Sequence, residues 1–379
     1  MRRRTFGLML ACGLLLLAAT AASAGKVRAL SIVKGPYLQN VTTDSITVMW
    51  QTSLASDSRV NYGPDSSYAG HVSDPTQVTV HEVHLTGLSL DTVYHYGVTS
   101  AATAKTGTQT ISSADGTFQT AVSPTTTSFR FAAYGDSRTQ SAVHATVVSA
   151  ILASAPRFVL HTGDFVSSGK KDSYWQTEFF DPAQPMISRL TLFPIQGNHE
   201  GNSALYYQYF DPPDGGGDYN ERWYSFDYGN AHFVAVDTQT SFSPGSAEYN
   251  WLVNDLASNS AKWLFVFQHY PAYSSGDHGG DAKVQTYLVP LYEQYGVDMV
   301  FCGHDHIYER SVKDGVQYVV TGGGGAPLYD VNLNPNPYQV YAHSLHHHCT
   351  IDINGTTATL RAVANDGSVF DTVTMTHSP

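Results

Sequence analysis

The first third of the chain alternates apolar and polar residues with a period of two. Residues 45–50 and 92–98 show this alternation most clearly, and turn-forming residues separate such runs. Successive side chains of a β-strand point to opposite faces, so this period predicts short strands that bury one face. Metal-ligating and acidic side chains do not cluster in this part of the sequence. We therefore predict that residues 25–122 form an all-β sandwich that acts as a scaffold.

The pattern changes after a Ser/Thr/Pro-rich stretch at residues 121–128, which has the composition of a short linker. Apolar runs now alternate with segments of helical spacing, of which residues 141–154 are an example. The apolar runs are residues 129–134, 157–161, 192–195, 232–237, 263–268 and 298–301. Strands that alternate with helices predict an α/β domain, which we place at residues 123–379. Runs typical of β-strands return between residues 317 and 376.

The N-terminus has the residue order of a secretory signal peptide. Three arginines, Arg2 to Arg4, precede an apolar run at residues 8–22, and small residues follow up to Ala24. We expect cleavage after Ala24, so that residues 1–24 are removed and the mature protein is secreted or periplasmic. A membrane anchor is the alternative, and the shortness of the run argues against it. No other apolar stretch approaches the length of a membrane span, so the mature chain is predicted to have none.

The charge of the chain limits its partners. The formal net charge is −12, and removal of three arginines with the signal peptide would make it −15. This acidity argues against a nucleic-acid partner. A site for a phosphorylated ligand would need its own positive charge, which metal ions can supply. The mature chain keeps two cysteines, Cys302 and Cys349, which could form a disulfide or stay as buried thiols. The oligomeric state has no signature in the sequence.

The apolar runs of the second domain end in residue types that bind metals. The ends read Gly135-Asp136, Gly163-Asp164, Gly197-Asn198-His199-Glu200, Gln268-His269 and Gly303-His304-Asp305-His306. In an open α/β sheet, ligands gather at the carboxyl ends of the strands, and glycine allows a sharp turn there. Asp, Asn and His together suit Fe, Zn or Mn rather than Ca. The two imidazoles of Gly-His-x-His diverge, so they can serve different ions. The set therefore predicts a site for two metal ions.

These motifs resemble the calcineurin-like metallophosphoesterase superfamily and, within it, the purple acid phosphatases. The resemblance covers nearly the whole mature chain and rests on residues 197–200, 266–269, 303–310 and 322–327, together with an N-terminal domain similar to fibronectin type III. It implies a catalytic domain of stacked β-sheets flanked by helices. In the sandwich it implies that Trp50 is a core residue and that residues 88–96 carry a structural tyrosine.

The resemblance also implies a role for each ligand. Asp164 would bridge the two ions. The first ion would be bound by Asp136 and His306, and the second by Asn198, His269 and His304.

Two positions depart from the family pattern. Purple acid phosphatases have a tyrosine three residues after the bridging aspartate, where this chain has Ser167. The broader superfamily has a histidine two residues after the first aspartate, where this chain has Arg138. The first ion therefore lacks an evident fourth protein ligand, which argues against ferric iron there. Without the tyrosine, the protein should also lack strong colour.

Four further residues are candidates for binding and proton transfer. Arg138 is expected to hold a phosphate oxygen with its planar guanidinium, and a structural salt bridge is the alternative. His199 is the candidate acid for the leaving group or a residue that orients it, although it could instead support a ligand by a hydrogen bond. His278 resembles a substrate-facing histidine, and a surface role is the alternative. Glu200 is expected to support a ligand or His199.

The residues and the resemblance together indicate a secreted dinuclear-metal phosphatase that acts on a small phosphorylated substrate. A metal-bound hydroxide would attack a phosphomonoester. A phosphodiesterase or nucleotidase using the same metal pair is the first alternative. A non-catalytic secreted binding protein is the second, and the incomplete first metal site supports it. The five intact motifs at the ends of the apolar runs argue against this second alternative. The tract of residues 346–348, three histidines, could close over the site or form a cluster at a strand edge.

Overall fold

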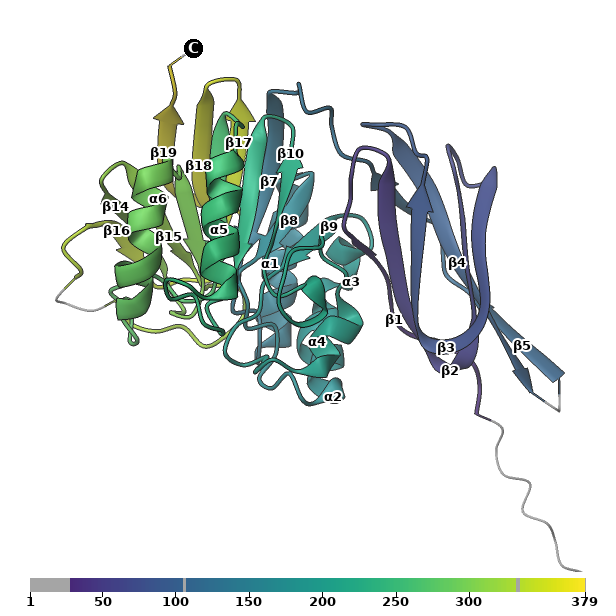
Figure 1. Ribbon diagram of the computed structural model, residues 1–379. Helices are drawn as coiled ribbons and strands as arrows, with labels where there is room; N and C mark the ends of the chain where they lie inside the picture. Colours follow the sequence, from purple (N-terminus) through teal and green to yellow (C-terminus); the bar gives the residue numbers. More distant parts are fainter. Residues whose placement is uncertain (1–27, 105–106, 332–334, 379) are drawn as a thin grey trace, which may run out of the picture.

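The N-terminal part of the chain is a β domain that packs beside a larger α/β domain (Figure 1). The structure, a computed structural model, describes residues 28–104, 107–331 and 335–378. The predicted signal peptide at residues 1–24 lies outside the described residues, and the predicted boundary after residue 122 stays a prediction.

Six antiparallel strands form the N-terminal domain. They are β1 (Ile32–Gln39), β2 (Ser45–Gly63), β3 (Gly70–Thr86), β4 (Val93–Ala104), β5 (Gly107–Ser112) and β6 (Gly116–Gln119). The first half of β2 pairs with β1 and with the end of β3, while its second half pairs with β4 and with the start of β3. Register shifts between Gln51 and Ser58 separate the two halves. The long strands thus pass from one layer to the other, and the predicted sandwich is confirmed.

Aromatic residues fill this sandwich as the sequence predicts. Trp50 is fully buried, stacks on His81 with ring centroids 4.6 Å apart, and donates a hydrogen bond to Ser100 Oγ. The hydroxyl of Tyr94 accepts a hydrogen bond of 2.9 Å from the backbone N–H of Ser89. This bond fastens the connection between two strands to the strand that follows it, which is the role expected of the structural tyrosine.

Two β-sheets face each other in the α/β domain. One sheet has the order β10-β11-β12-β13-β15-β14-β16 and the other has the order β19-β18-β17-β7-β8-β9. The strands of the first sheet are β10 (Tyr224–Tyr228), β11 (Ala231–Val236), β12 (Trp263–Gln268), β13 (Met299–Cys302), β14 (Tyr308–Lys313), β15 (Val316–Thr321) and β16 (Gln339–His343). Those of the second sheet are β7 (Ser128–Tyr134), β8 (Phe158–His161), β9 (Thr191–Pro194), β17 (His347–Asn354), β18 (Thr357–Ala364) and β19 (Val369–Thr376).

The inner faces of the two sheets meet through phenylalanines. Phe131 on β7 packs edge-on against Phe233 and Phe265 of the opposite sheet, with ring centroids 5.0 and 5.2 Å away. The neighbouring residues Ala132 and Tyr134 point to the outer face, where they pack among residues of the helices. The period of two in these strands therefore separates the core between the sheets from the core beneath the helices.

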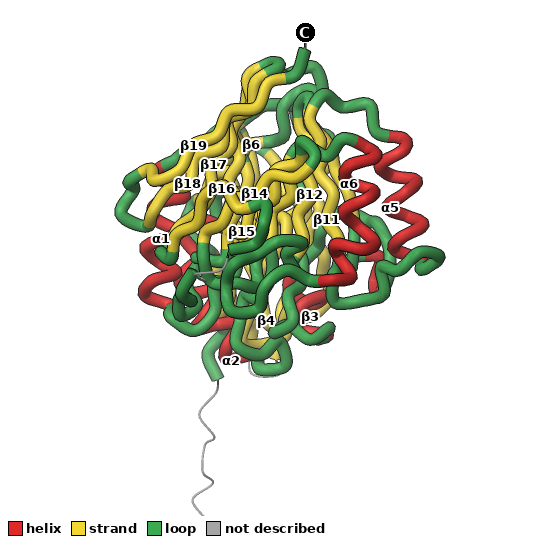
Figure 2. The backbone as a smooth tube through the Cα atoms, turned by 90° about the vertical axis from the view of Figure 1, so that its left-hand side faces the viewer, coloured by secondary structure: helices red, strands yellow, loops and turns green. Residues whose placement is uncertain are grey.

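Helices cover both outer faces, so the domain has four layers. Figure 2 shows the strands between α1 on one side and α5 and α6 on the other. The helices are α1 (Ser141–Ala153), α2 (Asp172–Tyr174), α3 (Asp181–Ile187), α4 (Ala204–Tyr209), α5 (Ala247–Ser258) and α6 (Val289–Tyr295), with π-helical turns η1 (Trp175–Phe180) and η3 (Val284–Leu288) and a 3₁₀ turn η2 (Asp218–Asn220). The predicted sheet sandwich flanked by helices is confirmed. Among the described residues, no helix is both long enough and apolar enough to cross a membrane.

The N-terminal domain contacts the segments that follow β8 and β9. Lys34 on β1 has a nearly fully buried side chain and forms an ion pair of 2.6 Å with Asp172 on α2. Tyr37 donates to the backbone carbonyl of Tyr209 at 2.8 Å, and Tyr96 donates to that of Ser188 at 2.9 Å. These bonds hold the sandwich against the helical segments that connect β8 with β9 and that follow β9. This contact agrees with a scaffold role.

His232 on β11 gives the fold a pH-dependent contact. Its Nδ1 lies 2.6 Å from Asp227 on β10 and its Nε2 lies 3.0 Å from Asp255 on α5. Burial alone would lower the pKa of His232, but the two carboxylates outweigh it and raise the pKa to about 9. The protonated ring can donate to both partners and so joins α5 to the sheet beneath it.

We predict that His232→Gln destabilises the protein by up to about 3 kcal/mol at pH 6. A raised pKa in the folded state stabilises the fold fully below pH 6.5, and this contribution is lost as the pH rises through about 9. The difference in unfolding free energy between wild type and variant should therefore shrink from pH 6 to pH 10. Urea unfolding at both pH values measures it, with His71→Gln at an exposed position as the control. An equal difference at both pH values would contradict the assignment.

Candidate metal centre

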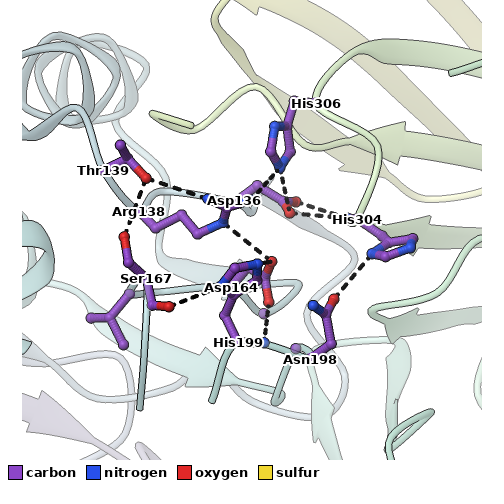
Figure 3. Close-up of polar contacts among 12 residues, drawn as sticks. Asp136, Arg138, Thr139, Asp164, Ser167, Asn198, His199, His304 and His306 are labelled. Atoms are coloured by element: carbon purple, nitrogen blue, oxygen red, sulfur yellow. Dashed lines mark hydrogen bonds and ion pairs between the residues drawn. The ribbon is translucent and has the colours of Figure 1, made fainter. Parts of the chain in front are cut away.

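The predicted ligands lie together at the carboxyl ends of five strands. β7 leads to Asp136, β8 to Asp164 and β9 to Asn198, while β12 leads to His269 and β13 to His304 and His306. The strands β7, β8 and β9 are parallel to one another, as are β12 and β13, so each sheet brings its ends to one edge. Figure 3 shows Asp136, Asp164, Asn198, His304 and His306 lying close together. The structure brings all six predicted ligands into one site.

The backbone carries strain at three of these ligands. Asp136, Asp164 and His304 have φ values of 56°, 56° and 74°, in the left-handed region that costs roughly 1–3 kcal/mol for a residue other than glycine. The preceding glycines were expected to make the sharp turns, but only Gly163 among them has a positive φ. Gly197 serves a different purpose, because a Cβ there would lie 2.2 Å from Asp164 Oδ1. The glycines mainly allow close approach, and the ligands themselves adopt the turns.

The ligands assigned to the second ion lie within a few ångströms of one another. His269 Nδ1 lies 2.9 Å from the carbonyl oxygen of Thr162 and donates to it, so its Nε2 carries a lone pair. That Nε2 lies 2.9 Å from Asn198 Oδ1 and 3.5 Å from Asp164 Oδ1. His304 Nδ1 lies 3.1 Å from the same Asn198 oxygen. Metal-binding atoms about 2.0–2.2 Å from one ion would be spaced in this way, so these side chains can converge on a cation.

The donors near the first ion position are arranged differently. His306 Nδ1 donates to the carbonyl of Pro327 at 2.7 Å, so its Nε2 is an acceptor. This Nε2 lies 3.6 Å from Asp136 Oδ1 and 3.3 Å from Arg138 Nη2. Arg138 Nε in turn lies 3.4 Å from Asp164 Oδ2, so the guanidinium stands between two of the predicted ligands (Figure 3). A cation from the chain itself therefore faces these donors.

The buried charges of the site act on one another. Burial and the neighbouring Asp164 raise the pKa of Asp136 well above its usual range, against the effect of Arg138. Burial also acts to raise the pKa of Asp164, but His269, His199 and Arg138 outweigh it and lower the pKa. Asp164 is therefore an anion, and the site contains negative charge that a bound cation would neutralise.

The imidazoles of the last motif are neutral at ordinary pH. Burial, followed by the neighbouring His269 and His278, lowers the pKa of His304 to about 3. Burial likewise lowers the pKa of His306 to about 4. A neutral imidazole keeps the lone pair that a metal ligand needs, so protons compete for these two donors only in strong acid.

Glu200 ties two of the ligand loops together by their backbones. Its Oε2 accepts hydrogen bonds from the N–H groups of Asp164 and Gly197 at 2.9 and 2.8 Å, and its Oε1 accepts from those of Phe165 and Val166. Burial and the charge of Asp164 raise the pKa of Glu200, while the N–H donors oppose the rise. Glu200 thus supports ligands, as predicted, but it acts through the backbone of Asp164 and not through His199.

Relatives and family models match both domains. Residues 129–308 match the calcineurin-like phosphoesterase family, and residues 35–120 match the N-terminal domain of purple acid phosphatases. This chain carries a calcineurin-like phosphoesterase domain. The resemblance inferred from the motifs is confirmed, and the family uses a dinuclear metal centre.

Individual proteins agree with this assignment. An uncharacterized protein of Mycobacterium tuberculosis is 28% identical over 337 residues, which cover 74% of this chain and 62% of that protein. The probable purple acid phosphatase 20 of Arabidopsis thaliana is 26% identical over 339 residues, which cover 79% of this chain and 76% of the relative. A purple acid phosphatase from yellow lupin seeds shares the fold with a TM-score of 0.80 at 21% identity, covering 92% of this chain and 74% of the lupin chain.

The two candidate proton-transfer residues of the phosphoesterase domain differ in their surroundings. His199 Nδ1 donates to the carbonyl of Ser167 at 2.9 Å, which leaves Nε2 facing the site, 3.8 Å from Asp164 Oδ2. His278 is exposed, stacks on the ring of His304 with centroids 4.3 Å apart, and lies 3.5 Å from the hydroxyl of Tyr329. Both side chains therefore lie against predicted metal ligands, with His278 at the rim.

Three residues of the site were missed by sequence reasoning. Tyr329 stacks on His306 with ring centroids 4.1 Å apart. Glu178 accepts hydrogen bonds from the N–H groups of Thr139 and Ser167 at 3.2 and 2.6 Å. Asp305 accepts from the N–H of His278 at 2.9 Å and so holds the loop that carries it. Asp305 could have been suspected from its place inside the last motif, whereas Glu178 and Tyr329 stand in segments with no distinctive pattern.

The cysteines and the histidine tract of the phosphoesterase domain are structural. Cys302 and Cys349 are both buried free thiols, which decides between the two possibilities left by the sequence. They belong to different hydrophobic clusters, one beneath α5 and α6 and one between the sheets. In the tract 346–348, the ring of His347 is buried beside Thr321 at 3.2 Å. His347 thus makes the contacts of a residue within a β-strand. This favours a cluster at a strand edge over a tract that closes over the site.

We predict that Glu200→Gln destabilises the protein by about 3 kcal/mol, because the new amide group would face two N–H donors that now meet a carboxylate oxygen. If the amide nitrogen replaced Oε2, the hydrogen bonds from Asp164 and Gly197 would be lost. If it replaced Oε1, the hydrogen bonds from Phe165 and Val166 would be lost. Urea unfolding measures the change. Glu248→Gln is a matched control, because buried Glu248 accepts its backbone hydrogen bond from Asp237 through one oxygen that the amide can replace. Equal losses in the two variants would contradict the role of Glu200.

Proposed function

We propose that this chain is a metal-dependent phosphatase that hydrolyses small phosphomonoesters. The observation that supports it best is the convergence of metal-binding atoms from Asp164, Asn198, His269 and His304 at the strand ends. Asn198 is exposed and His304 is partly exposed, so a substrate can reach this point from solvent. The match to the calcineurin-like phosphoesterase family supports the same reaction class.

The residues present fit a metal ion at the second position. Asp164, Asn198, His269 and His304 would hold it, and in the dinuclear arrangement of the family Asp136, Asp164 and His306 would hold the first. A metal ion bound there supplies a Lewis acid for the phosphoryl oxygens and lowers the pKa of a bound water. The mixture of Asn, Asp and His donors favours Zn, Mn or Fe.

The chain's own residues would handle the proton and the phosphate. When His199 is protonated, its Nε2 can donate to the leaving alkoxide, because Nδ1 is already engaged by the carbonyl of Ser167. This Nε2 lies 3.8 Å from Asp164 Oδ2, beside the proposed ion position. His278 lies at the rim and would act on the alcohol part of the ester. Arg138 offers N–H donors beside the ligands and would hold a phosphate oxygen.

The space next to the centre suits a small substrate. A cavity of about 350 Å³ adjoins His304 and is lined also by His278, Tyr270 and Asp281. A volume of this size fits a single sugar or a similar alcohol, and Asp281 can accept hydrogen bonds from hydroxyl groups.

An assay of p-nitrophenyl phosphate beside its bis ester separates the proposed reaction from phosphodiester hydrolysis. Faster turnover of the bis ester would replace the proposal by a diesterase. No turnover of either, or of a panel of sugar phosphates and nucleotides, would favour the binding protein.

We also propose that the protein is secreted or periplasmic. The residue order of positions 1–24 supports this location. Mass spectrometry of the protein from its native host would give Gly25 as the first residue. A retained Met1 would contradict it.

We predict that Asp164→Ala and His304→Ala each abolish phosphatase activity and metal binding while leaving the N-terminal domain folded. Each residue supplies a donor to the second ion position and belongs to no hydrophobic cluster. Activity on p-nitrophenyl phosphate and metal analysis by mass spectrometry check this, with Asp366→Ala at an exposed position as the control. Activity within roughly tenfold of wild type would refute the metal assignment.

We predict that Arg138→Ala lowers kcat/KM roughly ten- to a hundredfold and weakens inhibition by phosphate, because a charge-assisted hydrogen bond to phosphate is lost. The metal content should not fall. Arg138→Lys should rescue only part of the loss, because lysine offers a point charge in place of a planar fork. A normal phosphate inhibition constant together with a fall in metal content would mean that Arg138 organises ligands instead of binding substrate.

A further inference from the structure

The guanidinium of Arg138 lies among the residues that the family uses for its first ion. Its Nη2 is 3.3 Å from His306 Nε2 and its Nε is 3.4 Å from Asp164 Oδ2. Both of these acceptor atoms would have to turn their lone pairs to an ion bound at that position. The side chain of Arg138 is only 16% exposed, so it is packed into the site and does not extend into solvent.

Arginine cannot act as the missing ligand. The guanidinium stays protonated in proteins and offers only N–H donors, whereas the superfamily histidine at this position offers a lone pair. A divalent ion beside the guanidinium would also meet a like charge in a buried setting, where screening is weak. The side chain therefore opposes an ion at the first position by its charge, and its Nη2 also donates a hydrogen bond to His306 Nε2.

The second departure from the family does not compensate for the first. The hydroxyl of Ser167 lies 3.0 Å from Glu178 Oε1 and donates to it, and it lies 3.3 Å from Thr139 Oγ1. Its backbone N–H is held by the same carboxylate at 2.6 Å. Position 167 is thus turned toward Glu178, where the purple branch would supply a phenolate oxygen to the ion.

The second position has the opposite character. At this position His269 Nε2 and His304 Nδ1 lie 2.9 and 3.1 Å from Asn198 Oδ1. In the described part of the chain, no contact with a lysine or arginine is found for any of these three atoms. The second position is therefore open to a cation from solution, whereas the chain supplies its own at the first.

We propose that this chain binds one metal ion, held by Asp164, Asn198, His269 and His304, and that the Arg138 guanidinium takes the place of the first ion. The inference rests on the proposed function, because it concerns how the same site would hold a phosphate. One phosphate oxygen would contact the ion and another would contact the guanidinium fork. The inference departs from the two-ion expectation drawn from the family.

Metal counting tests the proposal directly. Full-length protein purified without a tag is loaded with excess zinc or manganese, desalted, and analysed by mass spectrometry for metal per chain. Wild type should hold one ion. Arg138→His restores the spacing of the superfamily ligand, and it should hold two.

Two controls locate the added ion. Arg189→His introduces a histidine at an exposed position after α3, and it should hold one ion as wild type does. Combining Arg138→His with His306→Ala removes a donor of the first position, and the count should return to one. Thermal unfolding of every variant checks that each is folded before its metal is counted.

The metal counts distinguish the single-ion proposal from a two-ion site. Two ions in wild type would overturn the single-ion proposal, and one ion in both wild type and Arg138→His would overturn the role given to Arg138. The same samples are assayed with p-nitrophenyl phosphate. An active wild type with two ions would leave the proposed function standing and reject only this inference. If the wild type binds one ion but hydrolyses no phosphate ester, the proposed function is rejected and the proposal of a single metal ion still holds.

Discussion

Two aspartates buried side by side at the strand ends set the main constraint on this structure. Asp136 and Asp164 have almost no exposed surface, and each raises the energy of a charge on the other. A buried carboxylate is tolerated only when cations or N–H donors surround it. The folded chain meets this requirement with backbone N–H groups, with Arg138 and with imidazoles that can hold a metal. The positions of the loops around the centre follow from it.

The backbone near these aspartates is strained, and hydrogen bonds to their carboxylates accompany the strain. Both take a left-handed φ, and the N–H of His304 lies 3.0 and 3.1 Å from the two oxygens of Asp136. The N–H of His199 donates to Asp164 Oδ1 at 3.0 Å. Because Gly303 lacks a Cβ, which would lie 2.4 Å from Asp136 Oδ2, the last motif can approach this closely. Local strain is thus offset by hydrogen bonds to charge, which are stronger than those between neutral groups.

The sequence predicts the strands, and the gathering of the candidate ligands at their carboxyl ends, because both depend on local order. A buried strand needs a continuous apolar run, and its carboxyl end is the first place where a polar side chain can leave the sheet, so Asp136, Asp164 and His269 stand out. What it could not predict depends on contacts between distant segments. Glu178 reaches Ser167 from the helical turn η1, and Tyr329 reaches His306 from the loop between β15 and β16. No spacing in the chain encodes these approaches. The direction of a long side chain such as Arg138 is set by the same distant contacts.

The two departures from the family pattern are connected through one carboxylate. Glu178 receives the N–H of Thr139, which follows Arg138, and it receives both the N–H and the hydroxyl of Ser167. A tyrosine at position 167 could not donate to Glu178 and also direct its oxygen to an ion at the first position. Glu178 thus holds both Ser167 and the loop beside Arg138, whose guanidinium lies between Asp164 and His306. The loss of the aromatic ligand and the presence of the arginine are consistent parts of a single arrangement.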